Sequence, residues 1–263
     1  MSQPITVVFQ AALLQEVQPF LRRVQARRLV GQKWPVWEFK WPGGRGLAVV
    51  SGLGEDAAAR AAAWVLEHHH PQALVSLGFG GALTPELPPG ALVLGEAFRR
   101  YDPETRALSE LPAPPSPAWF AALGDRLRAA GLPVYRGTLV STRGIVSKAG
   151  HGDPLADLTH PVLDLETSAA ALAARAHNLP FLALRALTDV AGEEIPGFLA
   201  RAVEQGRTPT AAQALAWVAA DPRRVAILYR LWRRSCLAAR HLAQALEAVL
   251  EVAQGPISVT NNQ

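Results

Sequence analysis

Hydrophobic residues follow two different spacings along the chain, and the two spacings alternate from the N-terminus onwards. Short runs rich in Val, Ile and Leu are typical of strands, whereas apolar positions three and four residues apart are typical of amphipathic helices. The strand pattern occurs at residues 5–9, 36–41, 46–54, 72–83, 91–98, 135–142 and 181–187. The helix pattern occurs at residues 13–24, 55–70, 118–131, 167–178 and 222–250. Strands that alternate with helices predict an α/β fold with a largely parallel sheet.

Some segments carry more specific expectations. Residues 36–41 alternate between polar and apolar and are expected to form an exposed edge strand. A capping side chain before a proline is expected to start helices at Thr208-Pro209 and at Asp221-Pro222. The last helix is expected to bury one continuous face, formed by Val225, Leu228, Leu231, Trp232, Leu242, Leu246 and Val249.

No internal repeat or long linker divides the chain. We therefore expect a single domain, residues 1–263, with a helical C-terminal extension that begins at about residue 208. In α/β sheets, ligands bind beyond the carboxyl ends of the strands. Polar or glycine-rich positions follow four of the expected strands, and we expect them to converge on one site. They are Glu16, Gly52 with Gly54, Gly78 to Gly81, and Thr188 with Asp189.

Composition restricts the class of protein. The chain has 263 residues, of which 49% are hydrophobic, enough for a sizeable core. The one cysteine, Cys236, allows no internal disulfide, and no apolar run approaches the roughly 20 residues that span a bilayer. We therefore expect a cytoplasmic protein. The formal net charge of +4 comes from arginine-rich helices without a nucleic-acid-binding motif, so no nucleic-acid partner is expected. Because the last helix is rich in arginine, peripheral contact with an anionic membrane remains an alternative.

Residues 164–194 read DLETSAAALAARAHNLPFLALRALTDVAGEE, and three further segments precede this stretch in a fixed order. They read AALLQEV, SGLGEDAAARAAAWVLEHHHPQALVSLGFGGALTPELPPGALVL and GTLVST. The ordered set resembles the nucleoside phosphorylase/nucleosidase superfamily, above all the methylthioadenosine/S-adenosylhomocysteine nucleosidases. The last helices resemble more closely the hopanoid-associated phosphorylases. The resemblance implies a three-layer fold, with a mixed, mostly parallel sheet flanked by helices, and a homo-oligomer.

The resemblance also implies an activity, the cleavage of the N-glycosidic bond of an adenine nucleoside by water or by phosphate. In the hopanoid-associated branch the substrate would be adenosylhopane, a membrane lipid precursor. In the nucleosidases it would be methylthioadenosine or S-adenosylhomocysteine. The expected partner is therefore a small-molecule nucleoside, which in the first case is linked to a lipid.

Cleavage of this bond leaves positive charge on the ribose and negative charge on the purine, unless an acid protonates purine N7. The resemblance assigns that acid to Asp189, the ribose hydroxyl groups to Glu166, and the positioning of the attacking water to Glu16. It also implies further substrate-binding positions, where glycines let the backbone approach the ligand closely. These positions are Leu165, Gly78, Phe79, Gly80, Ile145 and Val146.

Three of these positions depart from the nucleosidase pattern. Phe79 stands where nucleosidases have serine, Ile145 replaces the aromatic residue that stacks on the purine, and Leu165 replaces methionine. Because Phe79 and Ile145 alter the pocket, a non-catalytic nucleoside- or lipid-binding protein remains an alternative. Without the resemblance, Asp189 and Glu166 would be read as caps of turns or helices, and Glu16 as a solvated mid-helix residue.

The nucleophile is the other open choice. Phosphorylases of the superfamily carry an arginine two residues before the glycine turn, where this chain has Ser76. Arg143 and Arg185 do not occupy the phosphate-binding positions of the family, so we favour water. No cofactor is expected, and phosphate remains the alternative co-substrate.

Two other groups of residues invite a functional interpretation. Adjacent histidines at residues 68–70 point in different directions on a helix, so no metal site is expected there. Trp34, Trp37 and Trp41 are expected to pack in the core or against a subunit. The alternative for the tryptophans is an apolar rim around a hydrophobic substrate.

Overall fold

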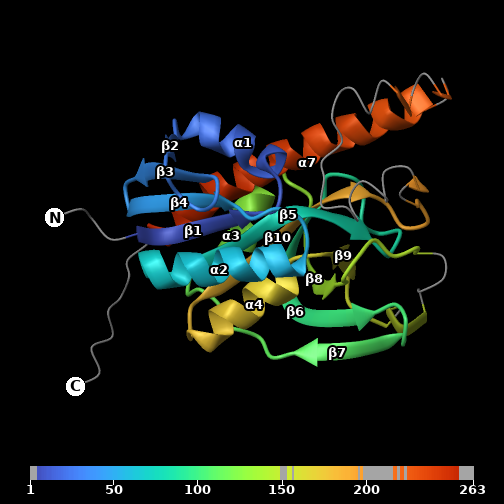
Figure 1. The fold of residues 1–263 in the computed structure, drawn as a ribbon, viewed down its shortest axis with the longest axis horizontal. Coiled ribbons are helices and arrows are strands. Elements are labelled where there is room, and N and C mark those ends of the chain that lie inside the picture. Colours follow the sequence, from blue (N-terminus) through green and yellow to red (C-terminus); the bar gives the residue numbers. More distant parts are fainter. Residues whose placement is uncertain are drawn as a thin grey trace.

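The computed structural model describes residues 5–148, 153–155, 157–194, 196–197, 216–217, 220–221 and 224–254. Within these ranges ten strands form one mixed sheet with helices on both faces (Figure 1), so the predicted three-layer α/β fold is confirmed. The strands are β1 (Ile5–Ala11), β2 (Arg27–Leu29), β3 (Val36–Trp41), β4 (Gly44–Val50), β5 (Leu74–Ala82), β6 (Leu92–Asp102), β7 (Ala107–Leu111), β8 (Val134–Ser141), β9 (Val162–Asp164) and β10 (Phe181–Asp189). The helices are α1 (Leu14–Arg23), α2 (Glu55–His69), α3 (Phe120–Ala129), α4 (Thr167–Ala176) and α7 (Arg224–Ala253), with a short 3₁₀ turn, η1 (Asp153–Leu155).

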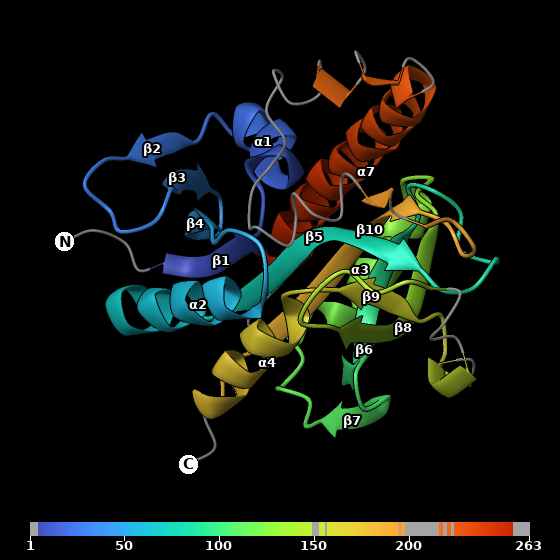
Figure 2. The ribbon, with the colours of Figure 1, turned by 45° about the vertical axis from the view of Figure 1, so that its right-hand side comes forward.

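The sheet curls until part of it closes on itself. Strand β1 lies between β4 and β5 and runs parallel to both, and β5 runs parallel to β10. From β10 the order continues through β6 and β8 to β9, and β9 pairs with β5 again. The two antiparallel pairings β10–β6 and β5–β9 therefore complete a ring of five strands, whose curvature is visible in Figure 2. Because β1, β4, β5 and β10 are parallel, their carboxyl ends lie at one edge of the sheet.

The prediction that residues 36–41 form the edge strand is wrong, because β2 covers the outer side of β3. Arg27 donates a hydrogen bond to Glu38, at 3.2 Å, and the guanidinium of Arg28 lies 5.7 Å from the ring centroid of Trp37. These contacts pair β2 with β3 although β2 is only three residues long and lacks the hydrophobic pattern of a strand.

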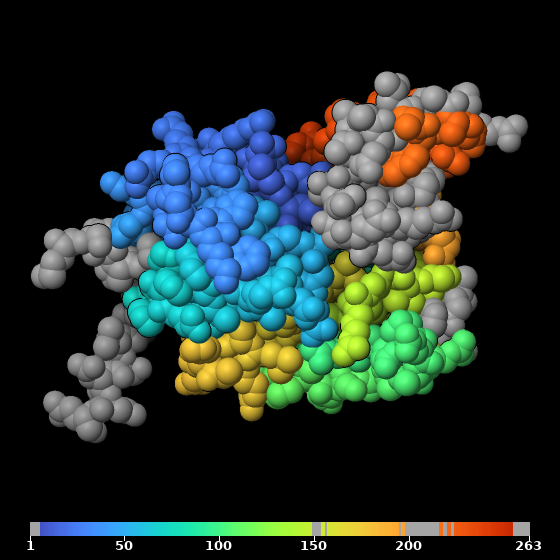
Figure 3. All heavy atoms as spheres, in the orientation of Figure 1, coloured from blue at the N-terminus to red at the C-terminus, as the bar shows by residue number. Residues whose placement is uncertain are grey.

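Helices cover the two faces of the sheet in two groups. Helices α2 and α4 pack side by side on one face, and form adjoining patches of the surface in Figure 3 (cyan and yellow). Helices α1, α3 and α7 pack on the other face, where α7 contacts both of the others and β10. Each face thereby buries its own hydrophobic cluster, and the sheet separates the two clusters.

Helix α7 contributes to the core. One face of its C-terminal half, from Ala238 to Leu250, is buried, and the helix packs with α1, α3 and β10. The N-terminal half departs from the predicted apolar face, because Val225 and Trp232 are exposed by 51% and 61%. Among the described residues, the buried positions of α7 begin only at Ala238, so the apolar side chains before it are not part of the core. The helix start expected at Thr208 lies outside the described residues.

The three tryptophans near the N-terminus are partly buried and pack against the core. Trp34 packs against the cluster under α2 and α4, while Trp37 and Trp41 pack against the cluster under α1 and α7. Trp41 also donates a hydrogen bond from its indole nitrogen to the hydroxyl group of Thr6, at 3.2 Å. None of the three lines the pocket described below, so the structure favours packing against the core over an apolar rim.

One property of the helices bears on membranes. None of the helices in the described residues is both long and apolar enough to cross a bilayer.

The core position of α7 predicts a large cost for truncating its buried side chains. Replacing Leu246, which is fully buried, with alanine should lower the free energy of unfolding by about 2–5 kcal/mol, because it removes buried apolar contacts and leaves a cavity in the core. The matched substitution Leu172→Ala, on the exposed side of α4, should change it by about 0.5 kcal/mol or less. Urea unfolding followed by tryptophan fluorescence measures both, and equal effects would contradict the placement of α7.

Candidate functional site

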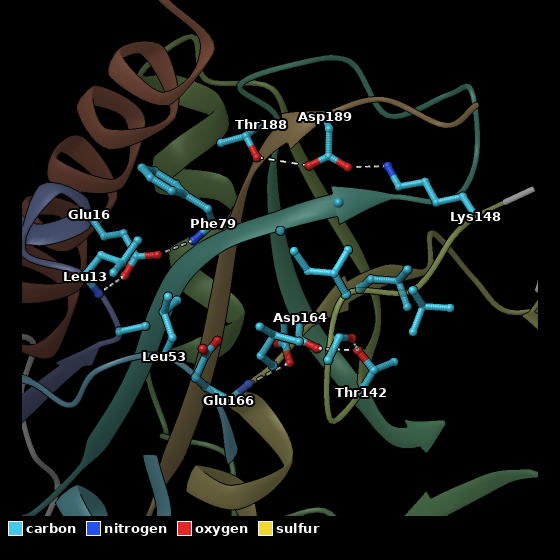
Figure 4. Close-up of a pocket in the computed structure, with 18 of the residues that line it drawn as sticks. Leu13, Glu16, Leu53, Phe79, Thr142, Lys148, Asp164, Glu166, Thr188 and Asp189 are labelled. Atoms are coloured by element: carbon cyan, nitrogen blue, oxygen red, sulfur yellow. Dashed lines mark hydrogen bonds and ion pairs between the residues drawn. The ribbon is translucent and has the colours of Figure 1, made fainter. Parts of the chain in front are cut away.

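The carboxyl ends of the parallel strands surround one pocket, which also receives the segment that follows β8 (Figure 4). Eight of the nine residues predicted for the site line this pocket, and only Gly78 does not. The structure thus brings distant parts of the chain together, while the roles of these residues remain predictions. The lining residues are Ala12, Leu13, Glu16, Leu53, Phe79, Gly80, Gly81, Thr142, Gly144, Ile145, Val146, Lys148, Leu163, Asp164, Leu165, Glu166, Thr188, Asp189 and Glu194.

Glu16 lies in the first turn of α1 and is buried, so the reading of a solvated mid-helix residue is wrong. Its carboxylate accepts a hydrogen bond from the backbone N–H of Leu13 at 2.8 Å and another from Phe79 at 2.9 Å. Burial raises the pKa of Glu16, while these two hydrogen bonds and the charge of Arg185 oppose the rise. A fixed carboxylate is therefore held between α1 and β5, facing the pocket (Figure 4).

The glycines of β5 make room for side chains. A Cβ atom at Gly78 would lie 3.1 Å from a carboxylate oxygen of Glu16, and one at Gly81 would lie 2.6 Å from an oxygen of Asp189. At Gly80 a Cβ atom would lie 2.5 Å from the Cγ1 atom of Val162 in β9. The absence of side chains here lets two acids and the crossing strand approach β5 closely.

Glu166 occupies the N-cap position of α4 but does not cap that helix. Its carboxylate instead accepts a hydrogen bond, at 2.9 Å, from the backbone N–H of Gly54, whose φ of 91° favours glycine. Burial, and then the negative charge of Asp164, raise the pKa of Glu166 to about 7. Asp164 performs the capping, because it accepts a hydrogen bond from the backbone N–H of Thr167 at 3.2 Å.

Asp189 ends β10 beside a cation that was not predicted from the sequence. Lys148 forms an ion pair with one carboxylate oxygen of Asp189, and the hydroxyl group of Thr188 donates to the other at 3.0 Å. Burial raises the pKa of Asp189, while the ammonium of Lys148 and the hydrogen bonds oppose the rise. The setting is therefore not simply apolar, since this end of the pocket holds a buried acid together with a buried amine (Figure 4).

A buried ion pair under the pocket was also missed. Arg185, in the middle of β10, donates from Nε to Asp164 at 2.9 Å and from a terminal nitrogen to Ser76 at 3.0 Å. Ser141 also donates a hydrogen bond to Asp164, at 2.6 Å. A charged residue within the apolar run 181–187 was the available signal, because a buried arginine requires a carboxylate partner.

The two arginines considered for phosphate binding do not approach the pocket. Arg185 is committed to the ion pair below it, and Arg143 is exposed and does not line it. Apolar side chains form much of the wall, and among the described lining residues Phe79 is the only aromatic one. Ile145, Val146 and Leu165 complete this apolar part, which suits a flat, weakly polar ligand.

The histidines at the end of α2 interact with the helix itself. The ring of His68 stacks on Trp64 with 5.4 Å between centroids, and its Nδ1 atom lies 2.9 Å from the backbone oxygen of Trp64. In the part of the chain that the structure describes, no three His, Cys, Asp or Glu side chains are grouped to bind a metal.

The raised pKa of Glu166 predicts a pH-dependent gain in stability on removing its charge. In the unfolded chain the group ionises near 4.5, but in the folded protein only near 7, so its ionisation opposes folding above that range. Glu166→Gln should therefore raise the free energy of unfolding by about 1–3 kcal/mol at about pH 8, with no gain at about pH 4.

The control for this measurement is Glu67→Gln, a substitution of an exposed glutamate on α2. Denaturant unfolding at the two pH values compares both variants with the natural chain. If the effect of Glu166→Gln on the free energy of unfolding did not change with pH, the ionised form of Glu166 would not destabilise the folded protein.

Comparison with known proteins gives a family and a set of similar folds. A model of the phosphorylase superfamily matches residues 6–221. S-adenosylhomocysteine nucleosidase from Streptococcus pyogenes, in complex with 5-methylthiotubericidin, is 17% identical, with a TM-score of 0.70, over 94% of this chain and 97% of its own.

Two other solved structures are similar to the same extent. 5′-Methylthioadenosine/S-adenosylhomocysteine nucleosidase from Neisseria meningitidis, in complex with methylthio-immucillin-A, is 19% identical, with a TM-score of 0.69, over 94% of this chain and 99% of its own. Futalosine hydrolase of Helicobacter pylori is 14% identical, with a TM-score of 0.67, over 92% of this chain and 97% of its own. At these identities the likeness establishes the fold.

Proposed function

The chain belongs to the phosphorylase superfamily, and from this premise we propose that it is an enzyme that cleaves the N-glycosidic bond of an adenine nucleoside. One observation carries the proposal. Three carboxylates from separate elements, Glu16, Glu166 and Asp189, line one partly apolar pocket at the carboxyl edge of the sheet. Without a ligand, holding three buried acids together costs stability, which favours a role in chemistry over one in folding.

The three acids suit the three charges of the reaction. Asp189, together with the groups around it, would contact N7 of the purine, where a proton stabilises the departing base. Glu166 would accept hydrogen bonds from the ribose hydroxyl groups and stabilise the positive charge that develops on the sugar. Glu16, fixed by two backbone N–H groups, would orient the nucleophile and take its proton.

Water is the proposed nucleophile. A phosphate dianion requires several N–H donors or cations directed at it. Arg185 already bonds Asp164 and Ser76, and Arg143 lies outside the pocket wall. A buried carboxylate such as Glu16 repels a phosphate dianion but accepts a proton from water.

A lipid-linked adenine nucleoside such as adenosylhopane is a second, narrower candidate, and one observation favours it. The N-terminal half of α7 exposes Val225, Tyr229 and Trp232, by 51%, 57% and 61%, next to Arg230 and Arg233. Exposed aromatic and basic residues on one helix suit the interface of an anionic membrane, where such a substrate would be located.

The test is chromatography of adenine released from methylthioadenosine, S-adenosylhomocysteine, adenosine and an adenosyl-hopanoid extract, with and without phosphate. We expect free adenine from at least one of them without phosphate. Asp189→Asn should lower the rate by about 10²–10⁴-fold, because an amide cannot protonate the base, while nucleoside binding measured by calorimetry persists.

Asp125→Asn, on the exposed surface of α3, is the matched control and should be fully active. Adenine release only when phosphate is present would replace water by phosphate as the nucleophile. Nucleoside binding by the natural chain without any release of base would instead make it a binding protein.

A further inference from the structure

Lys148 and Asp189 form a buried pair at one end of the pocket. Their side chains are exposed by only 7% and 9%, and both line the pocket wall. The ammonium of Lys148 also donates a hydrogen bond to the backbone oxygen of Val190 at 2.9 Å. An ammonium has three N–H donors, so these two contacts within the described residues leave one donor that can face the pocket.

The choice of lysine is unusual for this chain. Only three of its 26 basic residues are lysines, Lys33, Lys40 and Lys148, and all the others are arginines. The guanidinium of arginine would make the stronger ion pair, but it does not release a proton under physiological conditions. An amine binds a carboxylate and can also release a proton to it, so lysine is suited to this position if the proton has to move.

We propose that Lys148 is part of the acid, and that in the free enzyme it holds the proton that later moves to the base through the Lys148–Asp189 pair. This rests on the proposed function. As the bond between C1′ and N9 breaks, its electron pair moves to the purine, and N7 takes one proton from the pair. The ribose carbon takes the hydroxyl group of the attacking water, whose other proton passes to Glu16. Glu16 later releases that proton to solvent, and the Lys148–Asp189 pair regains a proton from solvent.

A proton shared by Lys148 and Asp189 resolves a difficulty that arises if Asp189 alone protonates purine N7. Burial raises the pKa of Asp189, whereas the adjacent ammonium acts in the opposite direction and favours the ionised carboxylate. An ionised Asp189 cannot protonate a purine by itself, whereas the pair still contains one transferable proton.

Other charged groups surround the pair. Glu193, in the turn after β10, is neutralised by ion pairs with Arg230 and Arg234 of α7. Among the described residues, the other charged groups of the pocket wall are Glu194 after β10, Glu16 on α1, Asp164 on β9 and Glu166 before α4. Asp164 is paired with Arg185 of β10, below the pocket.

Two substitutions at Lys148 distinguish a role in proton transfer from a role in only holding Asp189 in place. Lys148→Arg keeps a cation and hydrogen-bond donors beside Asp189 but cannot release a proton. Its single-turnover rate should fall by about 10²-fold or more across the range from about pH 5 to about pH 9. Lys148→Met leaves Asp189 as the only member of the pair that can donate a proton, and Asp189 is protonated only below its raised pKa. The Lys148→Met variant should therefore be active at low pH, and its activity should disappear at a lower pH than that of the natural enzyme.

A merely structural lysine would give the opposite pattern. Lys148→Arg would then retain activity within about threefold of the natural enzyme, with an unchanged pH profile, and Lys148→Met would lose activity equally at every pH. Either result overturns the proposal. The matched controls are Lys40→Arg and Lys40→Met, at an exposed position of β3, and both should leave rate and profile unchanged.

A second measurement does not depend on turnover. With carbon-13 at the lysine Cε atoms, the spectrum contains three signals, and Lys148→Met identifies that of Lys148. Adenine should shift the signal of Lys148 and not those of Lys33 and Lys40, and 7-deazaadenine, which lacks N7, should shift it less. Equal shifts, or none, would overturn the role of Lys148. If the natural chain cleaves no nucleoside at all, the proposed function fails as well.

Discussion

The arrangement of the pocket depends on one buried ion pair, between Asp164 of β9 and Arg185 of β10. Both side chains are almost completely buried, and the pair gathers donors and acceptors from three further elements: Ser76 of β5, Ser141 of β8 and Thr167 of α4. Removing one partner of such a pair costs about 3–5 kcal/mol, because the other charge remains buried. The network thus fixes the closed part of the sheet at the edge where the catalytic acids are proposed to act.

The same pair sets the electrostatics above it. The charge of Arg185 opposes the rise in the pKa of Glu16 and of Glu166, whereas Asp164 raises that of Glu166. Asp189 lies beside a cation of its own, so the three acids occupy three different environments. Differently tuned carboxylates in one pocket suit a reaction in which one group donates a proton, a second accepts one and a third stabilises positive charge.

The sequence predicted the long strands and helices, because hydrophobic periodicity marks them. It also predicted most of the residues named for the pocket, because Glu16, Glu166 and Asp189 follow strands or precede helices. It did not predict β2, β7 and β9, which are too short or too exposed to show a period, nor the closure of the sheet, which depends on pairing between distant strands. Lys148 and Asp164 were missed because nothing local distinguishes them from surface residues, and only the fold brings each next to its partner. The exposed half of α7 was read as buried because periodicity shows which residues share a face and does not show what covers it.

A crystal structure with a non-cleavable adenine nucleoside analogue would test the central claim most directly, since it locates the base, the ribose and the nucleophile together. We predict that the ribose hydroxyl groups lie within about 3.2 Å of the Glu166 carboxylate, with the base at Lys148 and Asp189. A water molecule should lie between Glu16 and C1′ of the ribose. An analogue bound elsewhere, or bound in this pocket with its ribose away from Glu166, would contradict the roles proposed for these acids.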